Sequence, residues 1–234
     1  MALPKIDVPV YSIELPSTGE VIKYRPFLVR EQKQLLIAQN AGLEQQTQAV
    51  IDLVAECTFN KLDVRKLPAY DLEFLFLRLR ANSVGENIDL VLTCGECENR
   101  QDAHLDLTAV QVKKYPDHNN NVDLGGGLLV NLADPDLENL AVLRGSANPD
   151  VNQIIRLIAS CIKTIWKDED MYSALDYSPA ELIEFVENLS PANFGKLEQF
   201  FLSMPKLRHE INFKCNKCGS DNTAALEGLQ SFFG

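Results

Sequence analysis

Stretches of alternating apolar and polar residues occur at three places along the chain, and they predict three β-hairpins. Near the N-terminus, two such stretches flank a turn that contains Gly19, which predicts a hairpin at about 10–25. The other two hairpins are predicted at 87–107 and 206–226, where the alternation surrounds a Cys-x-x-Cys pair. Each cysteine pair is therefore expected at the tip of a hairpin.

Apolar residues spaced three and four apart predict helices in two further parts of the chain. The first part covers about 29–82, and its last helix, which begins near Pro68, is apolar over most of its girth. The second helical part covers about 134–204 and includes a helix at 150–165. Ser178 is expected to cap a later helix in this part, because Pro and Glu follow it at the positions of a capping box.

A polar, turn-rich stretch at 114–127 separates the first cysteine hairpin from the second helical part. It is expected to be a mobile loop that opens a strand at 128–132. Three consecutive glycines, Gly125 to Gly127, lie in this stretch. No Lys-Ser or Lys-Thr follows them, so the sequence does not predict a phosphate-binding loop.

Together these patterns predict an α+β fold in a single compact domain, residues 1–234. The core is expected to be mainly helical, with an N-terminal β-hairpin and two Cys-x-x-Cys β-hairpins joined in a split zinc-ribbon-like site. Hydrophobic residues make up 46% of the chain and charged residues 24%, as in ordinary globular proteins. No apolar run approaches the roughly 20 residues of a membrane span, so no membrane association is expected.

Four of the six cysteines form the two pairs, Cys94 with Cys97 and Cys215 with Cys218. Two such pairs can supply the four thiolates of a closed tetrahedral zinc site. A structural Zn²⁺ ion is favoured, because catalytic zinc usually keeps an open position and four thiolates leave none. About 117 residues separate the pairs, against roughly 15–20 in a compact zinc ribbon. One shared ion would thus tie the middle of the chain to its end.

Other interpretations of the four cysteines stay open. An iron–sulfur cluster uses the same ligands. A redox dithiol usually begins a helix in a βαβ setting, whereas these flanks are hairpin-like. Unligated thiols in two turns are the simplest alternative. The N-terminal segment lacks the apolar core of a signal peptide, so we expect a reducing compartment, where paired cysteines more often bind metal than form disulfides. Cys57 and Cys161 lie in apolar helical patterns and are expected to be buried.

Net charge argues against nucleic acid as a partner. The formal charge is −11 and the sequence pI is about 4.8, so the average surface repels phosphate. The second cysteine hairpin carries basic residues, namely Lys206, Arg208, Lys214 and Lys217. The first carries acidic ones, namely Asp89, Glu96, Glu98 and Asp102. A zinc-ribbon nucleic-acid-binding regulatory protein remains the alternative function, and it requires the basic residues to converge on one exposed face.

Catalytic constellations are scarce in this sequence. It contains only three histidines, His104, His118 and His209, and the first and last of these are expected as contacts on the hairpin strands. No serine lies in a Gly-x-Ser-x-Gly elbow, and no His-Glu-x-x-His motif is present. The sequence therefore predicts a protein that is not an enzyme.

Several segments of the chain resemble a known family. They are ELPSTGEVIKYRPFLVREQKQLL, LPAYDLEFLFLRLRANSVGENI and the two Cys-x-x-Cys hairpins. In them the chain resembles the baseplate hub proteins of T-even-like contractile-tailed phages, from about residue 10 to the second cysteine hairpin. The family's cysteine pairs correspond to Cys94, Cys97, Cys215 and Cys218, and the resemblance brings no catalytic residues.

The resemblance implies a non-enzymatic role in assembly of the baseplate hub, as a hub component or as an assembly chaperone. Its partners would be other tail or hub proteins, with the tape-measure protein as one candidate client. The implied location is the host cytoplasm during assembly, with the virion baseplate as a further option. The oligomeric state is not indicated.

Apolar residues on the helix before each cysteine hairpin are the candidate partner contacts. Phe74 and Leu77 lie beside the main apolar stripe of the first of these helices, and Phe200 and Phe201 lie on the second. An acidic chain with such a surface suits the covering of an amphipathic client helix, because the charge keeps the chain soluble.

Overall fold

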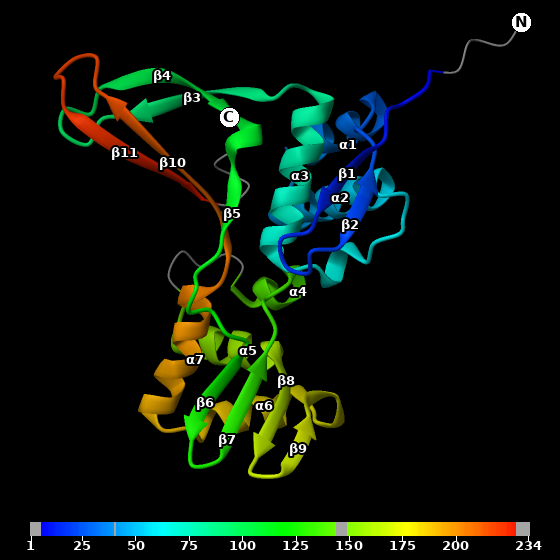
Figure 1. Ribbon diagram of the computed structural model, residues 1–234, viewed down its shortest axis with the longest axis vertical. Helices are drawn as coiled ribbons and strands as arrows, with labels where there is room; N and C mark the ends of the chain where they lie inside the picture. Colours follow the sequence, from blue (N-terminus) through cyan, green and yellow to red (C-terminus); the bar gives the residue numbers. More distant parts are fainter. Residues whose placement is uncertain (1–5, 40, 144–148, 228–234) are drawn as a thin grey trace, which may run out of the picture. The chain divides into compact units, whose positions relative to one another are not determined.

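The computed structural model of the protein describes residues 6–39, 41–143 and 149–227 (Figure 1). The chain forms two compact units, and its α+β class is as predicted. Unit 1 comprises the described residues of Met1–Val64, Tyr70–Lys113 and Lys206–Gly234, and unit 2 those of Arg65–Ala69 and Lys114–Pro205. In chain order, most of unit 2 is thus inserted between two parts of unit 1. The single compact domain stays a prediction.

Unit 1 begins with the hairpin that the sequence predicts. It is formed by β1 (Tyr11–Glu14) and β2 (Val21–Tyr24), which pair antiparallel. Asp71 holds the tip of this hairpin: the Ser17 N–H donates to its Oδ1 at 3.0 Å, and the Ser17 hydroxyl donates to its Oδ2. Asp71 is itself fully buried, so the LPSTGE turn is fixed by a buried hydrogen-bonded carboxylate.

The helices of unit 1 follow the predicted positions closely. They are α1 (Val29–Gln39), α2 (Leu43–Cys57) and α3 (Ala69–Ser83, in unit 1 from Tyr70), with the short 3₁₀ helices η1 (Val64–Lys66, mostly in unit 2) and η2 (Leu107–Ala109). Helix α3, apolar over most of its girth, is buried along most of its length, and Leu75 and Leu79 have no exposed surface. Its burial anchors the core of the unit.

Two long hairpins carry the cysteine pairs, as predicted. The first joins β3 (Asn87–Thr93) to β4 (Arg100–Asp106), and the second joins β10 (Lys206–Lys214) to β11 (Asp221–Glu227). Side chains from α3 and both hairpins share one core, formed by Phe74, Leu77, Ala81, Ile88, Leu90, Leu105, Leu107, Val110 and Leu207. The alternation along β3 fits this arrangement, since Ile88, Leu90 and Leu92 are buried and their neighbours are exposed.

A short strand explains how the two cysteine pairs meet despite their distance in sequence. Strand β5 (Gln111–Lys113) pairs antiparallel with β10, with Val112 opposite Leu207. The chain therefore leaves unit 1 at Lys113 and returns at Lys206 on neighbouring strands. Most of the long spacing between the pairs is thus the inserted segment Lys114–Pro205.

Unit 2 is built on an antiparallel sheet of strand order β6-β7-β8-β9 (Figure 1). The strands are β6 (Asn121–Gly125), β7 (Leu128–Leu132), β8 (Ile162–Lys167) and β9 (Asp170–Ser173). The helical elements are α4 (Leu137–Leu140), η3 (Ala141–Leu143), α5 (Val151–Cys161), η4 (Ala174–Asp176), α6 (Pro179–Glu187) and α7 (Pro191–Ser203). Ser178 caps α6 in the predicted capping box. Val130, Ile158 and Leu197 have no exposed surface, which places the core between the sheet and these helices.

The helix predicted at 150–165 is wrong over its last four residues. Helix α5 ends at Cys161, and β8 begins at Ile162. A register shift in the β7–β8 pairing places Ile162 opposite Leu132 and Ile165 opposite Val130, so both isoleucines face the core. This bulge gives a strand the three-residue spacing of a helix, which is why the apolar pattern misleads.

The prediction of a loop over all of 114–127 is also wrong, because its last part forms β6 and the tight turn into β7. The turn uses Gly125, Gly126 and Gly127, each with positive φ. At Gly127, with a φ of 73°, a Cβ atom would be strained and would also displace the Asp168 carboxylate, so glycine is strongly favoured there.

A buried carboxylate fixes the start of α1. Glu31 has no exposed surface and accepts hydrogen bonds from Arg25 (2.9 Å), Arg30 (2.6 Å) and the N–H of Leu28 (2.6 Å). Burial alone would raise the pKa of Glu31, but these three donors outweigh it and lower the pKa from 4.5 to about 2. The ionised carboxylate therefore stabilises this corner of unit 1.

We predict that Glu31→Gln lowers the free energy of unfolding by about 3 kcal/mol at pH 7, since one unit of pKa corresponds to about 1.4 kcal/mol. Because the folded pKa is depressed, this stability is present above pH 4.5 and is lost as the pH falls toward 2. Urea unfolding of both proteins at pH 7 and pH 3 measures the effect. Glu44→Gln, at an exposed carboxylate of α2, is the control and should change little. A difference that is equally large at both pH values would contradict the assignment.

Candidate metal centre

The two cysteine pairs lie in turns of the same backbone design. In the first turn, the N–H of Cys94 donates to the carbonyl of Asn99 at 2.9 Å, and the N–H of Glu98 donates to the carbonyl of Cys94 at 3.0 Å. The turn after Cys215 repeats both hydrogen bonds at equivalent positions, with the same distances. Glu98 and Gly219 match in this comparison, with φ values of 54° and 74°. Each turn therefore points its two sulfurs to one side.

The first turn contains a left-handed residue that is not a glycine, so the sequence does not predict its conformation. Glu98, four residues after Cys94, adopts the left-handed conformation that Gly219 adopts in the second turn. Gly95 instead serves as a donor, because its N–H donates to the Asn222 side chain at 2.9 Å. A left-handed non-glycine residue costs about 1 kcal/mol or more, and the fixed geometry of the turn offsets this cost.

All four sulfur atoms converge, as the sequence predicts. The Sγ atoms of Cys94 and Cys218 lie 3.7 Å apart, as do those of Cys97 and Cys215, and all four lie within 4.8 Å of one another. Cys94 and Cys215 are buried, Cys97 is half-buried and Cys218 is exposed. Each close contact joins one hairpin to the other.

The spacing of the sulfurs fits a tetrahedral metal ion. Zinc–thiolate bonds of about 2.3 Å place the sulfurs of a regular tetrahedron about 3.8 Å apart, close to the two distances of 3.7 Å. A disulfide would need about 2.0 Å between sulfurs. The four cysteines would supply a closed coordination shell to such an ion, which would act as a structural crosslink with no open position for chemistry.

Hydrogen bonds to the sulfurs favour the thiolate form on one side of the cluster. The Ser220 hydroxyl, followed by the N–H of Cys97, lowers the pKa of the Cys94 thiol to about 5. Ser220 also lowers the pKa of Cys218. For Cys97 the N–H of Asn99 favours the thiolate, but burial and the neighbouring thiols together raise its pKa to about 12. Four thiolates this close repel one another unless a cation lies among them.

Polar side chains join the two hairpins around the sulfurs. The Asn99 amide donates to the Asn216 side chain at 2.7 Å, and the Gln101 amide donates to the carbonyl of Lys214 at 3.2 Å. Asn222 donates to the sulfur of Cys94 at 3.5 Å. Such outer contacts hold ligands in place around a metal.

Comparison with protein-family models identifies the family of the chain. The sequence profile described as T4 bacteriophage base plate protein matches residues 8–234. The chain belongs to this family. The match includes both cysteine pairs and both structural units. Comparison with curated proteins and with solved structures finds no significant match.

Membership of the base plate protein family indicates a structural or assembly role in the phage base plate, and the family is typically non-enzymatic. Its partners are accordingly other base plate proteins. Among the residues that the structure describes, no helix combines the length and the apolar character needed to cross a membrane.

The candidate partner contacts of this base plate protein lie mostly inside it. Phe74, Leu77 and Phe200 are buried, whereas Phe201 is partly exposed and stacks edge-on against Phe200 at 5.0 Å. In this structure a partner could reach Phe201 more readily than the other three. The assignment of these residues to partner binding stays a prediction.

Cys57 and Cys161 are buried as expected, with 0% and 1% exposure. Burial raises the pKa of their thiols to about 11 and about 12. His104 makes the predicted cross-strand contact, with its Nδ1 2.5 Å from the Asp89 carboxylate. The two cysteines serve the packing of the fold, whereas the His104–Asp89 contact is exposed on the first cysteine hairpin.

Sequence reasoning missed a polar cluster around His118 in unit 2. Its Nε2 lies 2.9 Å from Asp134 Oδ1 and its Nδ1 lies 3.2 Å from Ser203 Oγ. The Ser203 hydroxyl also donates to the carbonyl of Phe200 at 3.1 Å. The His118 and Asp134 side chains are largely buried, with 9% and 12% exposure. The cluster therefore joins His118 to helix α7 and to the segment after β7 inside unit 2, and its partners 16 and 85 residues away left no local signal.

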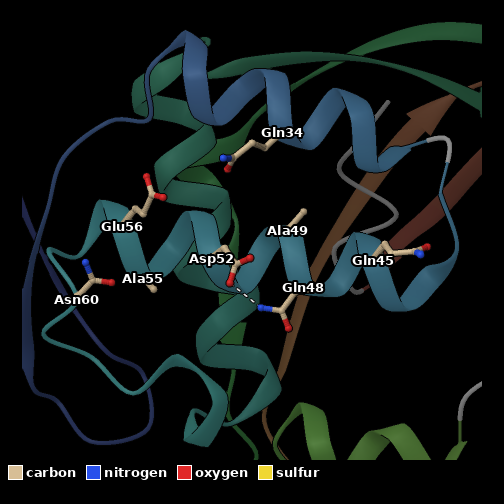
Figure 2. A pocket seen from close by; sticks show the side chains of 8 residues that line it. All are labelled: Gln34, Gln45, Gln48, Ala49, Asp52, Ala55, Glu56 and Asn60. Atoms are coloured by element: carbon tan, nitrogen blue, oxygen red, sulfur yellow. Dashed lines mark hydrogen bonds between the residues drawn. The ribbon is translucent and has the colours of Figure 1, made fainter.

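A polar groove lies between α1 and α2 in unit 1 (Figure 2). It has a volume of about 470 Å³ and is lined by Gln34, Gln45, Gln48, Ala49, Asp52, Ala55, Glu56 and Asn60. Gln48 donates to Asp52 at 2.6 Å, within one face of α2. The lining is open and amide-rich, which is ordinary for a solvated helix surface.

We predict that the purified protein binds one metal ion per chain and that Cys94→Ser/Cys218→Ser lowers the bound metal to near zero. Metal analysis by mass spectrometry measures the ratio. Ser220→Ala is the matched control: it keeps all four ligands but removes hydrogen bonds to two sulfurs, so the ratio should hold while affinity falls about 10- to 100-fold. Full metal occupancy in the double variant would exclude a four-thiolate site.

Proposed function

We propose that this protein acts in assembly of the phage baseplate hub, as a hub component or as an assembly chaperone, and that it has no enzymatic activity. The observation that carries the proposal is the family match over residues 8–234. The resemblance of its opening hairpin and leucine-rich helix to hub proteins supports the more specific hub role. The tape-measure protein is the candidate client, and the host cytoplasm is the site of action before any incorporation into the virion.

The four cysteines are proposed to hold one structural Zn²⁺ ion in this role. Support comes from sulfur spacings of 3.7 Å and from the absence of room for a fifth ligand in a four-thiolate shell. The ion would join the β3–β4 and β10–β11 hairpins into a single rigid ribbon. An iron–sulfur cluster is the alternative, and its visible absorption distinguishes it from colourless zinc.

The nucleic-acid-binding alternative receives less support from the charges on β10. Lys206 lies 3.3 Å from the Glu227 carboxylate, and Arg208 lies 2.9 Å from that of Glu210. These carboxylates offset the positive charge of Lys206 and Arg208, so this end of the β10–β11 hairpin attracts phosphate less. Lys214 and Lys217 remain exposed near the metal ligands, and two lysines form a small footprint for a phosphate backbone.

A phage that lacks this gene tests the function most directly. We predict that infection yields no complete tails and that the wild-type gene supplied in trans restores them. Quantitative mass spectrometry of proteins bound to a tagged copy, compared with finished tails, separates the two roles. A hub component is present in both samples, and a chaperone only in the first.

Normal tails from the deletion phage would contradict the proposed role. Salt-sensitive retention of the purified protein on DNA, lost in Lys214→Ala/Lys217→Ala, would instead support the nucleic-acid-binding alternative.

A further inference from the structure

Unit 2 contains an apolar cleft between its sheet and helix α6. The cleft has a volume of about 410 Å³, and its lining combines residues of β7, β8 and β9 with residues of α6 and the segment before it. Ile165 and Tyr172, which lie opposite each other in the β8–β9 pairing, form one wall. Leu182 and Phe185 form the other. Most of this lining is apolar and reaches the surface of the unit.

Large apolar side chains remain exposed at the mouth of the cleft. Tyr172 and Tyr177 are each 40% exposed, with their ring centroids 6.5 Å apart. Leu175, in the short helix η4 between them, is 96% exposed. Exposed aromatic and aliphatic side chains beside a concave surface are typical of a protein-binding site.

The segments around the cleft carry a strong negative charge. Between Lys167 and Glu187 the chain has seven carboxylates and one lysine. The lysine is already engaged, since its ammonium lies 3.7 Å from the Asp168 carboxylate and donates to the carbonyl of Gly126. Glu181 lines the cleft, and its carboxylate also accepts hydrogen bonds from Ser178. Two further exposed carboxylates lie close to lining residues in the sequence, Asp176 next to Tyr177 and Glu184 next to Phe185. We call Asp176, Glu181 and Glu184 the acidic rim.

We propose that this cleft binds an amphipathic segment of a partner tail protein, with apolar side chains in the cleft and Lys or Arg facing the acidic rim. The inference rests on the proposed assembly function and names the chemistry of its partner. A helix that places apolar and basic side chains on adjacent stripes meets both requirements at once. The rim would steer such a segment and exclude acidic ones.

Charge also argues against the other occupants of such a cleft. A second copy docked through the same face would bring two acidic rims together, because a two-fold interface pairs like surfaces. Nucleic acid would meet the same repulsion from its phosphates. A basic partner segment is the occupant that removes unfavourable charge while it covers the exposed tyrosines and Leu175.

Binding of designed peptides to the full-length protein tests the proposal. The probes are fluorescein-labelled 14-residue peptides: a Leu/Lys amphipathic helix, a Leu/Glu helix of the same pattern and a Ser/Lys peptide. Fluorescence anisotropy should detect saturable binding of the Leu/Lys peptide and at least about tenfold weaker binding of the other two. The contrast with the Leu/Glu peptide should shrink as salt is raised.

Variants of exposed residues locate the site without disturbing the core. Asp176→Lys/Glu184→Lys should weaken the Leu/Lys peptide about tenfold, and Tyr177→Ser by about five- to tenfold. The charge control is Asp52→Lys/Glu56→Lys, which makes the same change in the groove of Figure 2. The apolar control is Tyr11→Ser, which removes a tyrosine of matching exposure (39%) that also pairs with another tyrosine. Both controls should bind like the wild type.

Equal binding of the Leu/Lys peptide to cleft variants and wild type would overturn the proposal, as would equally tight binding of the Leu/Glu peptide. Complementation of the deletion phage separates this inference from the proposed function. If wild type restores tails and the cleft variants do not, both stand. If the cleft variants restore tails as well as wild type, the cleft inference fails alone. If the deletion phage makes normal tails, the assembly function fails regardless of the peptide data.

Discussion

The convergence of four cysteine sulfurs is the constraint on which unit 1 depends. Sulfurs from residues 94 and 218 lie 3.7 Å apart although 124 positions separate them in the chain. Neutral thiols gain little from such proximity, and four thiolates would repel one another. A metal ion bound by the four sulfurs would reverse the sign of this interaction and turn the cluster into a crosslink. The pairing of β5 with β10 then keeps both ends of the inserted unit on neighbouring strands.

The two units differ in the features that they carry. In unit 1, the cysteine cluster, the buried Asp71 contact and the buried Glu31 cluster each join separate segments of backbone. In unit 2, the sheet and helices form their own core, and exposed tyrosines and carboxylates border an apolar cleft. The surface suited to a partner thus lies in unit 2, which fits the proposed assembly role.

The parts of the fold that the sequence predicts are those encoded locally. The hairpins around the cysteines follow from period-two alternation, and the cap of α6 follows from Ser178, Pro179 and Glu181. The helical pattern extends four residues into β8, because a bulge spaces Ile162 and Ile165 by three residues. The inserted unit, the His118 cluster and the left-handed Glu98 depend on contacts distant in sequence or on turn geometry, and neither leaves a periodic signal.

Hydrogen exchange of the protein with and without its metal tests the central claim most directly. If a metal ion bound by the four cysteines stabilises unit 1, its removal by a chelator should abolish protection of amides in β3, β4, β10 and β11. Protection in β6 to β9 of unit 2 should remain, because that sheet has its own core. Unchanged exchange in the cysteine hairpins, or equal loss of protection in both units, would contradict the account.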